Sequence, residues 1–250
     1  MTKPKKEIRV YLRKLVDHFF YINNLNDQLR ILKSWESPKR VAAIEVGTHF
    51  FGLVSYSFQR AILIELCKLL SEDEDKSLVD FLRKAKEHAN SIDPQIYDIA
   101  SERHRTVATS QYRSVIQQHK KMLDDKKGLI KRIRGRRNKM LAHSDATYFN
   151  NPEKIYSKYP INIIEIDELL ETVSTILKSH YNYLFNTDLG MTFHTSTGLE
   201  AVLIYVRAYK RFWEDNRLTK LKKFSYSQDN FDVQIPFIFK AKCALTSRSS

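Results

Sequence analysis

The 250-residue chain contains little glycine, proline or cysteine, with six, six and two residues respectively. Because glycine and proline are the usual breaks between regular elements, their scarcity leaves room for long uninterrupted helices. The two cysteines, Cys67 and Cys243, belong to no Cys/His cluster with the spacing of metal ligands. The sequence therefore argues against a disulfide scaffold, and we expect neither a bound metal nor a cofactor.

The first residues, Met1-Thr2-Lys3-Pro4-Lys5-Lys6-Glu7, lack the apolar core of a secretory signal. The most apolar stretch, residues 41–70, is interrupted by side chains that hydrocarbon disfavours: Glu45, His49, Gln59, Arg60 and Glu65. We therefore expect a cytoplasmic protein in a reducing compartment, with a buried helix at 41–70 and no contact with a membrane.

Acidic residues are outnumbered, since 42 Lys and Arg face 29 Asp and Glu, a formal net charge of +13. This balance favours a polyanionic partner such as nucleic acid or an anionic surface, although a merely soluble basic protein is the alternative. The densest basic stretch is residues 120–139, where only Asp124 and Asp125 oppose the positive charge. A solvated helical face would also explain such a run, but its excess of charge favours contact with RNA.

Hydrophobic residues recur with helical spacing through most of the chain. The pattern predicts helices over residues 8–35, 37–70, 77–90, 93–143, 167–185 and 197–213. The fold class expected is mostly α, with an antiparallel helical bundle over residues 1–187. Residues 188–250 form a predicted α/β appendage, in which one helix precedes a small β-hairpin turning at residues 227–230.

The basic run leads into the segment Arg137-Asn138-Lys139-Met140-Leu141-Ala142-His143. Arg137 has a planar fork of donors suited to phosphate, and histidine has the side chain whose pKa best suits proton transfer near neutrality. In an ideal helix, six residues correspond to about 9 Å of rise and roughly 120° of rotation. Arg137 and His143 would therefore converge only on a ligand in a groove, or across a second copy of the segment. Arg and His at a helix end also commonly serve the helix dipole.

An Arg-Asn pair followed by four residues and His resembles the motif of the HEPN superfamily, the helical higher-eukaryote-and-prokaryote nucleotide-binding domains. Within it, Arg137-Asn138-Lys139 with Ala142-His143-Ser144-Asp145 is similar to the AbiU-like abortive-infection branch. Residues 61–70, followed by an acidic loop and Ser77-Leu78, support the same branch. The resemblance covers residues 10–185.

The resemblance implies a helical, metal-independent endoribonuclease that works as a homodimer, with both motifs lining one cleft. His143 would be the general acid or base, Arg137 would stabilise charge on the scissile phosphate, and Asn138 would orient either one. The products would carry 2′,3′-cyclic phosphate and 5′-hydroxyl ends. The neighbouring cations expected to bind RNA are Lys127, Lys131, Arg132, Arg134, Arg136 and Lys139.

The same resemblance implies a toxin or anti-phage defence effector acting on RNA, with tRNA as one candidate, and an antitoxin or regulatory protein as a second partner. Some relatives carry a modified tyrosine two residues after the histidine, where this chain has Asp145. Asp145 either holds His143 in one tautomer or is a polar residue at a helix end. Two alternatives to the nuclease remain: a non-catalytic RNA- or nucleotide-binding module, and a structural or regulatory helical bundle.

Overall fold

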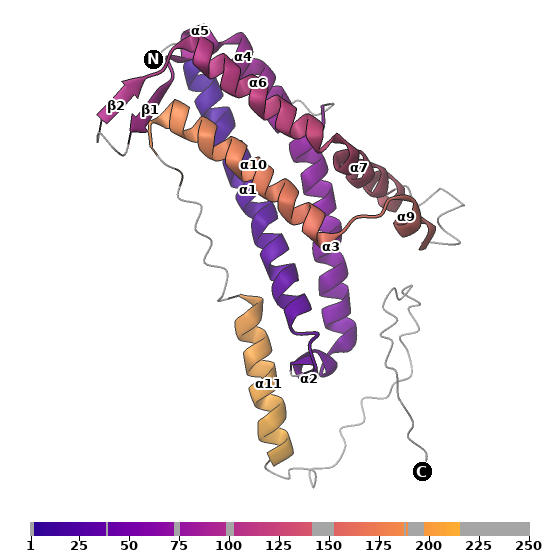
Figure 1. Cartoon of the computed structure of the whole chain (residues 1–250). Coiled ribbons are helices and arrows are strands. Elements are labelled where there is room, and N and C mark those ends of the chain that lie inside the picture. Colours follow the sequence, from indigo (N-terminus) through magenta and orange to yellow (C-terminus); the bar gives the residue numbers. More distant parts are fainter. Residues whose placement is uncertain are drawn as a thin grey trace.

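The computed structural model describes residues 3–38, 40–72, 76–98, 103–141, 153–187, 189 and 198–215. Within these residues the chain is mostly helical, and Figure 1 shows its elements in space. The helices are α1 (Lys3–Ser34), α2 (Val41–Glu45), α3 (Thr48–Leu70), α4 (Leu78–Glu87), α5 (Ala89–Ile92), α6 (Thr109–Asp125), α7 (Lys127–Leu141), α9 (Glu153–Lys158), α10 (Ile163–Phe185) and α11 (Leu199–Asp215). The strands are β1 (Gln95–Asp98) and β2 (Arg103–Thr106).

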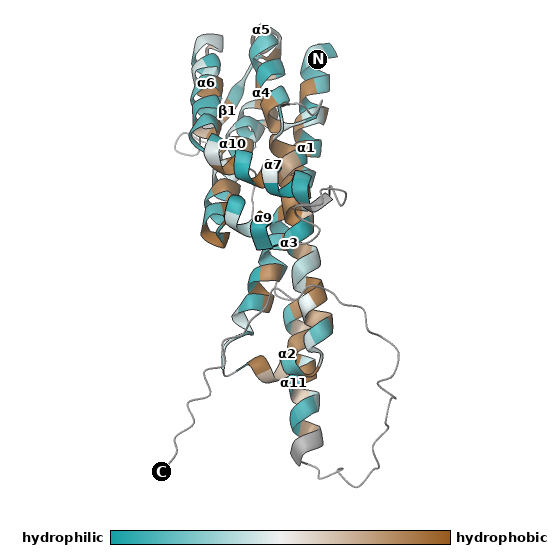
Figure 2. Ribbon diagram, turned by 90° about the vertical axis from the view of Figure 1, so that its right-hand side faces the viewer, coloured by the Kyte–Doolittle hydropathy of each residue, from teal (hydrophilic) through white to brown (hydrophobic). Residues whose placement is uncertain are grey.

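The main core lies between α1, α3 and α10, with α4, α6 and α7 packed around them. Buried side chains on α1 recur every three or four residues, and Figure 2 shows hydrophobic and hydrophilic residues alternating along the long helices. Leu12, Phe19 and Ile22 of α1 meet Leu66 of α3 and Leu169 of α10, all at most 1% exposed. The predicted mostly α bundle is therefore confirmed.

A chain of three polar side chains crosses this core between α6 and α10. The Tyr112 hydroxyl lies 3.1 Å from Nδ1 of His180, and Nε2 of His180 lies 3.1 Å from Nδ1 of His119. All three are buried, His180 completely. Burial lowers the pKa of His119 to about 4, and burial together with the neighbouring His119 lowers the pKa of His180 well below its ordinary value. Both imidazoles are therefore neutral in the folded protein at neutral pH.

Two predicted helices are interrupted in the structure. The helix expected over 37–70 divides at Val46 and Gly47 into α2 and α3, and the buried part is the second half of α3. The prediction of a helix from Asp93 to His143 is wrong at its start, because Pro94 leads into the antiparallel hairpin of β1 and β2. Asp93 has a positive φ of 48°, which turns the chain out of α5 rather than into a helix. The same tract is also broken at Lys126, between α6 and α7.

Helix α11 packs on the far ends of α1 and α2, away from the main core (Figure 1). A second hydrophobic cluster joins them through Leu32, Trp35, Ala43 and Leu203, with Phe51 of α3. The adjoining face of α11 exposes Val202, Tyr205, Tyr209 and Phe212, which recur at helical spacing. The hairpin predicted around residues 227–230 lies outside the described residues, so that prediction stays open.

One described helix, α3, is long and apolar enough to cross a membrane by length and composition, a test that core helices also satisfy. Its second half is buried in the main cluster. There Glu65 lies 2.8 Å from Nε2 of His18 and accepts a 2.7 Å hydrogen bond from Lys68. Burial alone would raise the pKa of Glu65, but the hydrogen bonds from Lys68 and His18 lower it. This half of α3 therefore packs as a bundle helix with a partnered carboxylate.

Candidate functional site

The basic run identified in the sequence lies on the end of α6 and on α7, which follow each other along one edge of the molecule (Figure 1). Helix α7 packs on α3 and buries Leu129 and Ile133. It ends at Leu141, so Arg137 and Asn138 stand in its last turns. His143 and Asp145 lie outside the described residues.

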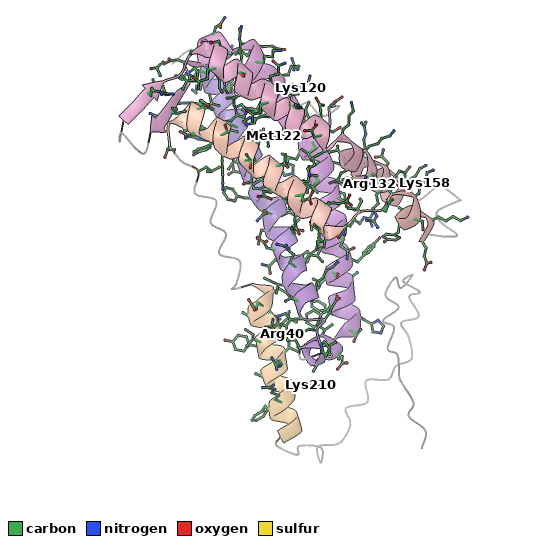
Figure 3. All side chains as sticks on the ribbon, viewed as in Figure 1. Arg40, Lys120, Met122, Arg132, Lys158 and Lys210 are labelled. Atoms are coloured by element: carbon green, nitrogen blue, oxygen red, sulfur yellow. The ribbon has the colours of Figure 1, made fainter. Side chains whose placement is uncertain are left out.

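One side of α7 is fastened to the start of α10 through Arg132. Its Nε donates a 2.9 Å hydrogen bond to the Pro160 carbonyl, and its guanidinium also pairs with Glu165. Glu165 in turn accepts a hydrogen bond of 2.9 Å from the backbone N–H of Asn162, whose side chain caps α10. Arg132 therefore acts within the bundle, and Figure 3 shows it between α7 and α10.

The same side of α7 meets α9 through Arg136, whose guanidinium lies 4.2 Å from the ring centroid of Tyr156. Burial lowers the pKa of Arg136 and raises the pKa of Tyr156. Gly135 permits this approach, because a Cβ at this position would lie 2.6 and 2.8 Å from Cδ1 and Cζ of Tyr159, the residue that follows α9. The α7–α9 contact therefore depends on the absence of a side chain at residue 135.

Replacing Gly135 with alanine is expected to destabilise the protein by about 1–3 kcal/mol, the usual range for overpacking a filled site. Gly128 is the matched control on the same helix, since a Cβ there would meet nothing within 4 Å. Gly128→Ala should leave stability unchanged or raise it by up to about 1 kcal/mol, because alanine is the better helix former. Urea denaturation at constant m-value measures both. Equal stability of the two variants would show that Tyr159 moves aside without cost.

The opposite side of α7 carries a different set of residues. Lys127, Lys131, Arg134 and Asn138 recur at i, i+4, i+7 and i+11, and all four are exposed. This spacing places them in one line along the helix, which we call the α7 stripe. Arg137 adjoins the stripe and is half-buried. Its Nε is buried and has no hydrogen-bond partner among the described residues.

Chemically, the site offers fixed positive charge beside a neutral donor and acceptor. Arg137 supplies a guanidinium that suits phosphate, and Asn138 supplies an exposed amide one residue further on. No group of three His, Cys, Asp or Glu side chains that could hold a metal occurs in the part of the chain that the structure describes. The described residues of the site thus carry groups whose chemistry suits an anion, and the role of His143 in proton transfer stays a prediction from the sequence.

A family model for AbiU2, a family of HEPN domains, matches residues 6–212, which run from α1 into the last turn of α11. The chain belongs to the AbiU2 family of HEPN proteins. No curated protein and no solved structure matches it. The resemblance predicted from residues 137–143 is therefore confirmed, and the protein is an abortive-infection-related HEPN module.

In this HEPN protein the structure divides the cations predicted to bind RNA into two groups. Lys127, Lys131 and Arg134 lie together on the α7 stripe, and half-buried Lys139 follows at the helix end. Arg132 and Arg136 lie on the other side, against α10 and α9. Sequence reasoning missed Glu165 and Tyr156, which hold that side. The sequence does indicate a helix start at Asn162, because Glu165 follows three residues later. No local pattern, however, links Glu165 to Arg132.

Proposed function

We propose that this HEPN protein is a metal-independent endoribonuclease of anti-phage defence, acting in the cytoplasm. The observation that carries the proposal is the position of Arg137 in the last turns of α7. Its guanidinium lies beside exposed Asn138 and the α7 stripe, and its Nε makes no hydrogen bond to any other described residue. A phosphate bound there would meet the planar guanidinium of a half-buried arginine, which can donate two parallel hydrogen bonds to phosphate oxygens.

The reaction follows from RNA itself, which supplies the 2′-hydroxyl as nucleophile, so that no activated water is needed. The 2′-oxygen attacks the adjacent phosphorus, the bond from phosphorus to the 5′-oxygen breaks, and a 2′,3′-cyclic phosphate and a 5′-hydroxyl result. His143 exchanges the protons that leave the 2′-oxygen and reach the 5′-oxygen. Arg137 stabilises the additional negative charge on the phosphate in the transition state. Asn138 orients the phosphate or the imidazole.

The proposed active form is a homodimer in which two copies of the Arg137–His143 segment share one cleft. Exposed apolar side chains on the first half of α3, among them Phe50 and Leu53, and on α11 offer surface for a second copy. Sedimentation of a monomer alone at micromolar concentration would contradict the dimer.

The products and the metal dependence test the proposal. Purified protein incubated with total RNA and with a tRNA pool in EDTA should leave fragments with 2′,3′-cyclic phosphate and 5′-hydroxyl ends. The matched control is a synthetic RNA that the protein cleaves, remade with 2′-O-methyl groups, which should remain intact because its nucleophile is blocked. Cleavage of the blocked RNA, or 5′-phosphate ends, would refute this mechanism. Bound but intact RNA would favour the non-catalytic binding module.

A further inference from the structure

A groove of about 920 Å³ opens between α3, α4, α6 and α7, on the side of α7 that carries the stripe. Its floor is aliphatic and includes Leu66, Leu82, Ile116 and Ile133. Its rim is basic and comes from three helices: Lys86 of α4, Lys120 of α6, and Lys127 with Lys131 of α7. Lys120 appears in Figure 3 on the α6 part of this edge.

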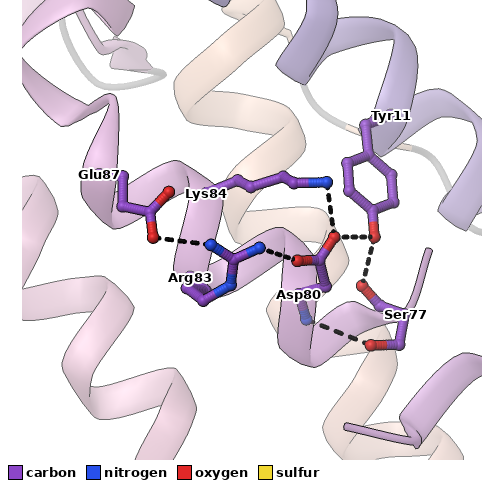
Figure 4. Close-up of polar contacts among 6 residues, drawn as sticks. All are labelled: Tyr11, Ser77, Asp80, Arg83, Lys84 and Glu87. Atoms are coloured by element: carbon purple, nitrogen blue, oxygen red, sulfur yellow. Dashed lines mark hydrogen bonds and ion pairs between the residues drawn. The ribbon is translucent and has the colours of Figure 1, made fainter. Parts of the chain in front are cut away.

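The charge of this rim exceeds what nearby carboxylates balance. Lys86, Lys120, Lys127 and Lys131 are exposed, and none is joined to a carboxylate in an ion pair among the described residues. Arg83 also lines the groove, but it bonds Asp80 at 2.5 Å and Glu87 at 2.8 Å, as Figure 4 shows. Among the described residues that line the groove, the acidic ones besides Asp80 are Glu72 and Asp124, so the cations outnumber them.

The negative charge of Asp80 is balanced within α4, which leaves the lysines on the rim of the groove available for a ligand. Burial would raise the pKa of this carboxyl, but hydrogen bonds from Lys84, Arg83 and the Tyr11 hydroxyl lower it (Figure 4). Its negative charge is therefore already matched by two cations of its own helix, α4. Asp80 does not reach across to compensate the lysines on α6 and α7.

The burial of the side chains at the floor of the groove indicates which class of ligand the groove favours. Its side chains are closed into the core: Leu66 is 0% exposed, Ile133 1%, Ile116 2% and Leu82 3%. An amphipathic helix docks by covering open apolar surface. The half-buried Val79 and Ile130 add some to this floor, which is still a small area for the face of such a helix. Among the described residues that line the groove, none carries an aromatic ring on which a base would stack. Recognition here therefore rests on the charge of the rim, which suits an extended polyanion.

We propose that the groove is the track along which the phosphate backbone of single-stranded RNA runs towards Arg137 and Asn138. This inference rests on the proposed function and specifies its substrate as an extended RNA strand held without base recognition. The α7 stripe connects the two sites, since Lys127, Lys131 and Arg134 line the groove and Asn138 continues the same line. It also assigns Lys86 and Lys120 to RNA binding and leaves Arg132 and Arg136 to the bundle.

Two pairs of charge reversals test the track: Lys86→Glu with Lys120→Glu, and Lys127→Glu with Lys131→Glu. The control is Lys14→Glu with Lys178→Glu, an equal change of charge at exposed lysines of α1 and α10, outside the groove. The probe is a 2′-O-methyl RNA of about 20 nucleotides, whose affinity is measured in EDTA over a series of salt concentrations. Each groove pair should weaken binding at least about tenfold and lower the salt slope by roughly 0.7 per lost contact.

The control pair should change affinity less than about twofold, through the long-range field alone. Groove variants that bind the probe as tightly as the control pair would overturn the track, as would wild-type binding to an acidic amphipathic peptide in place of RNA. Because the probe cannot be cleaved, the result is separate from catalysis. Wild-type protein that binds through the groove but never cleaves unblocked RNA would support the track and refute the nuclease. If the wild-type protein cleaves unblocked RNA while the groove variants bind the probe as tightly as wild type, the nuclease is supported and the track is refuted.

Discussion

Replacing Arg137 with glutamine is expected to reduce RNA cleavage about 10²- to 10³-fold, the usual loss when a donor to the charge that develops in the transition state is removed. The guanidinium stands half-buried at the end of α7, where its charge is screened less than that of an exposed lysine. Arg137→Lys should recover only part of the activity, because an ammonium group keeps the charge and loses the planar fork. Single-turnover cleavage of an RNA substrate measures both variants.

His143→Ala, measured beside them, is expected to lose about 10²- to 10⁴-fold of the cleavage rate, as general acid–base catalysis predicts. The control is Arg211→Gln, which removes the same charge from an exposed position on α11. This variant should cleave within about twofold of wild type, and all four variants should unfold at the wild-type urea concentration. Cleavage by Arg137→Gln at the rate of Arg211→Gln would remove Arg137 from the mechanism.

Acidification from pH 7.5 to 5.0 is expected to lower the free energy of unfolding by more than about 2 kcal/mol. The cause is the buried chain of Tyr112, His180 and His119. In the unfolded protein both histidines titrate near their ordinary pKa of 6.5, whereas in the folded protein their pKa values are lower, about 4 for His119. Between these values the unfolded state binds more protons, so stability falls as pH falls. Above about pH 7.5 both are almost entirely neutral in either state, and their contribution hardly changes.

Urea denaturation at half-unit pH intervals measures this slope. His119→Gln should flatten it, because one of the two depressed titrations is removed while a polar partner remains for His180. The control is His88→Gln, an exposed histidine at the end of α4 that should leave the slope unchanged. The carboxylates with lowered pKa values, Glu65 and Asp80, act below about pH 4.5 and leave this window to the histidines. A slope in His119→Gln equal to that of wild type would refute the assignment.

The long helices could be predicted because their cores repeat locally. Buried residues of α1 and α10 recur every three or four positions, and this periodicity is legible in the sequence. The structure of the segment after Asp93 could not be predicted in this way, because the local sequence does not distinguish a proline that opens a helix from one that leads into a hairpin. The positive φ of Asp93 and the pairing of Gln95 with Thr106 distinguish them, and both depend on contacts beyond the local window.

The candidate site shows the same division between local and distant information. Arg137, Asn138 and His143 could be selected from a short motif, and the family match supports the resemblance. The basic run around them looked uniform, because each cation has the same type of neighbours in sequence. Its division into two sides depends on Tyr156 and Glu165, which follow Arg136 and Arg132 by 20 or more residues. No helical periodicity reports on partners at that separation.

The pairing of Arg132 with Glu165 also fixes the roll of α7 about its own axis. Arg132 lies roughly 130° around the helix from the α7 stripe, given about 100° per residue. A turn of α7 in either direction would have to break the contact of Arg132 with Glu165 and Pro160 and weaken the cap of α10 at Asn162. The direction in which the stripe faces is therefore set from the far side of the helix, by residues that no ligand in the groove would contact.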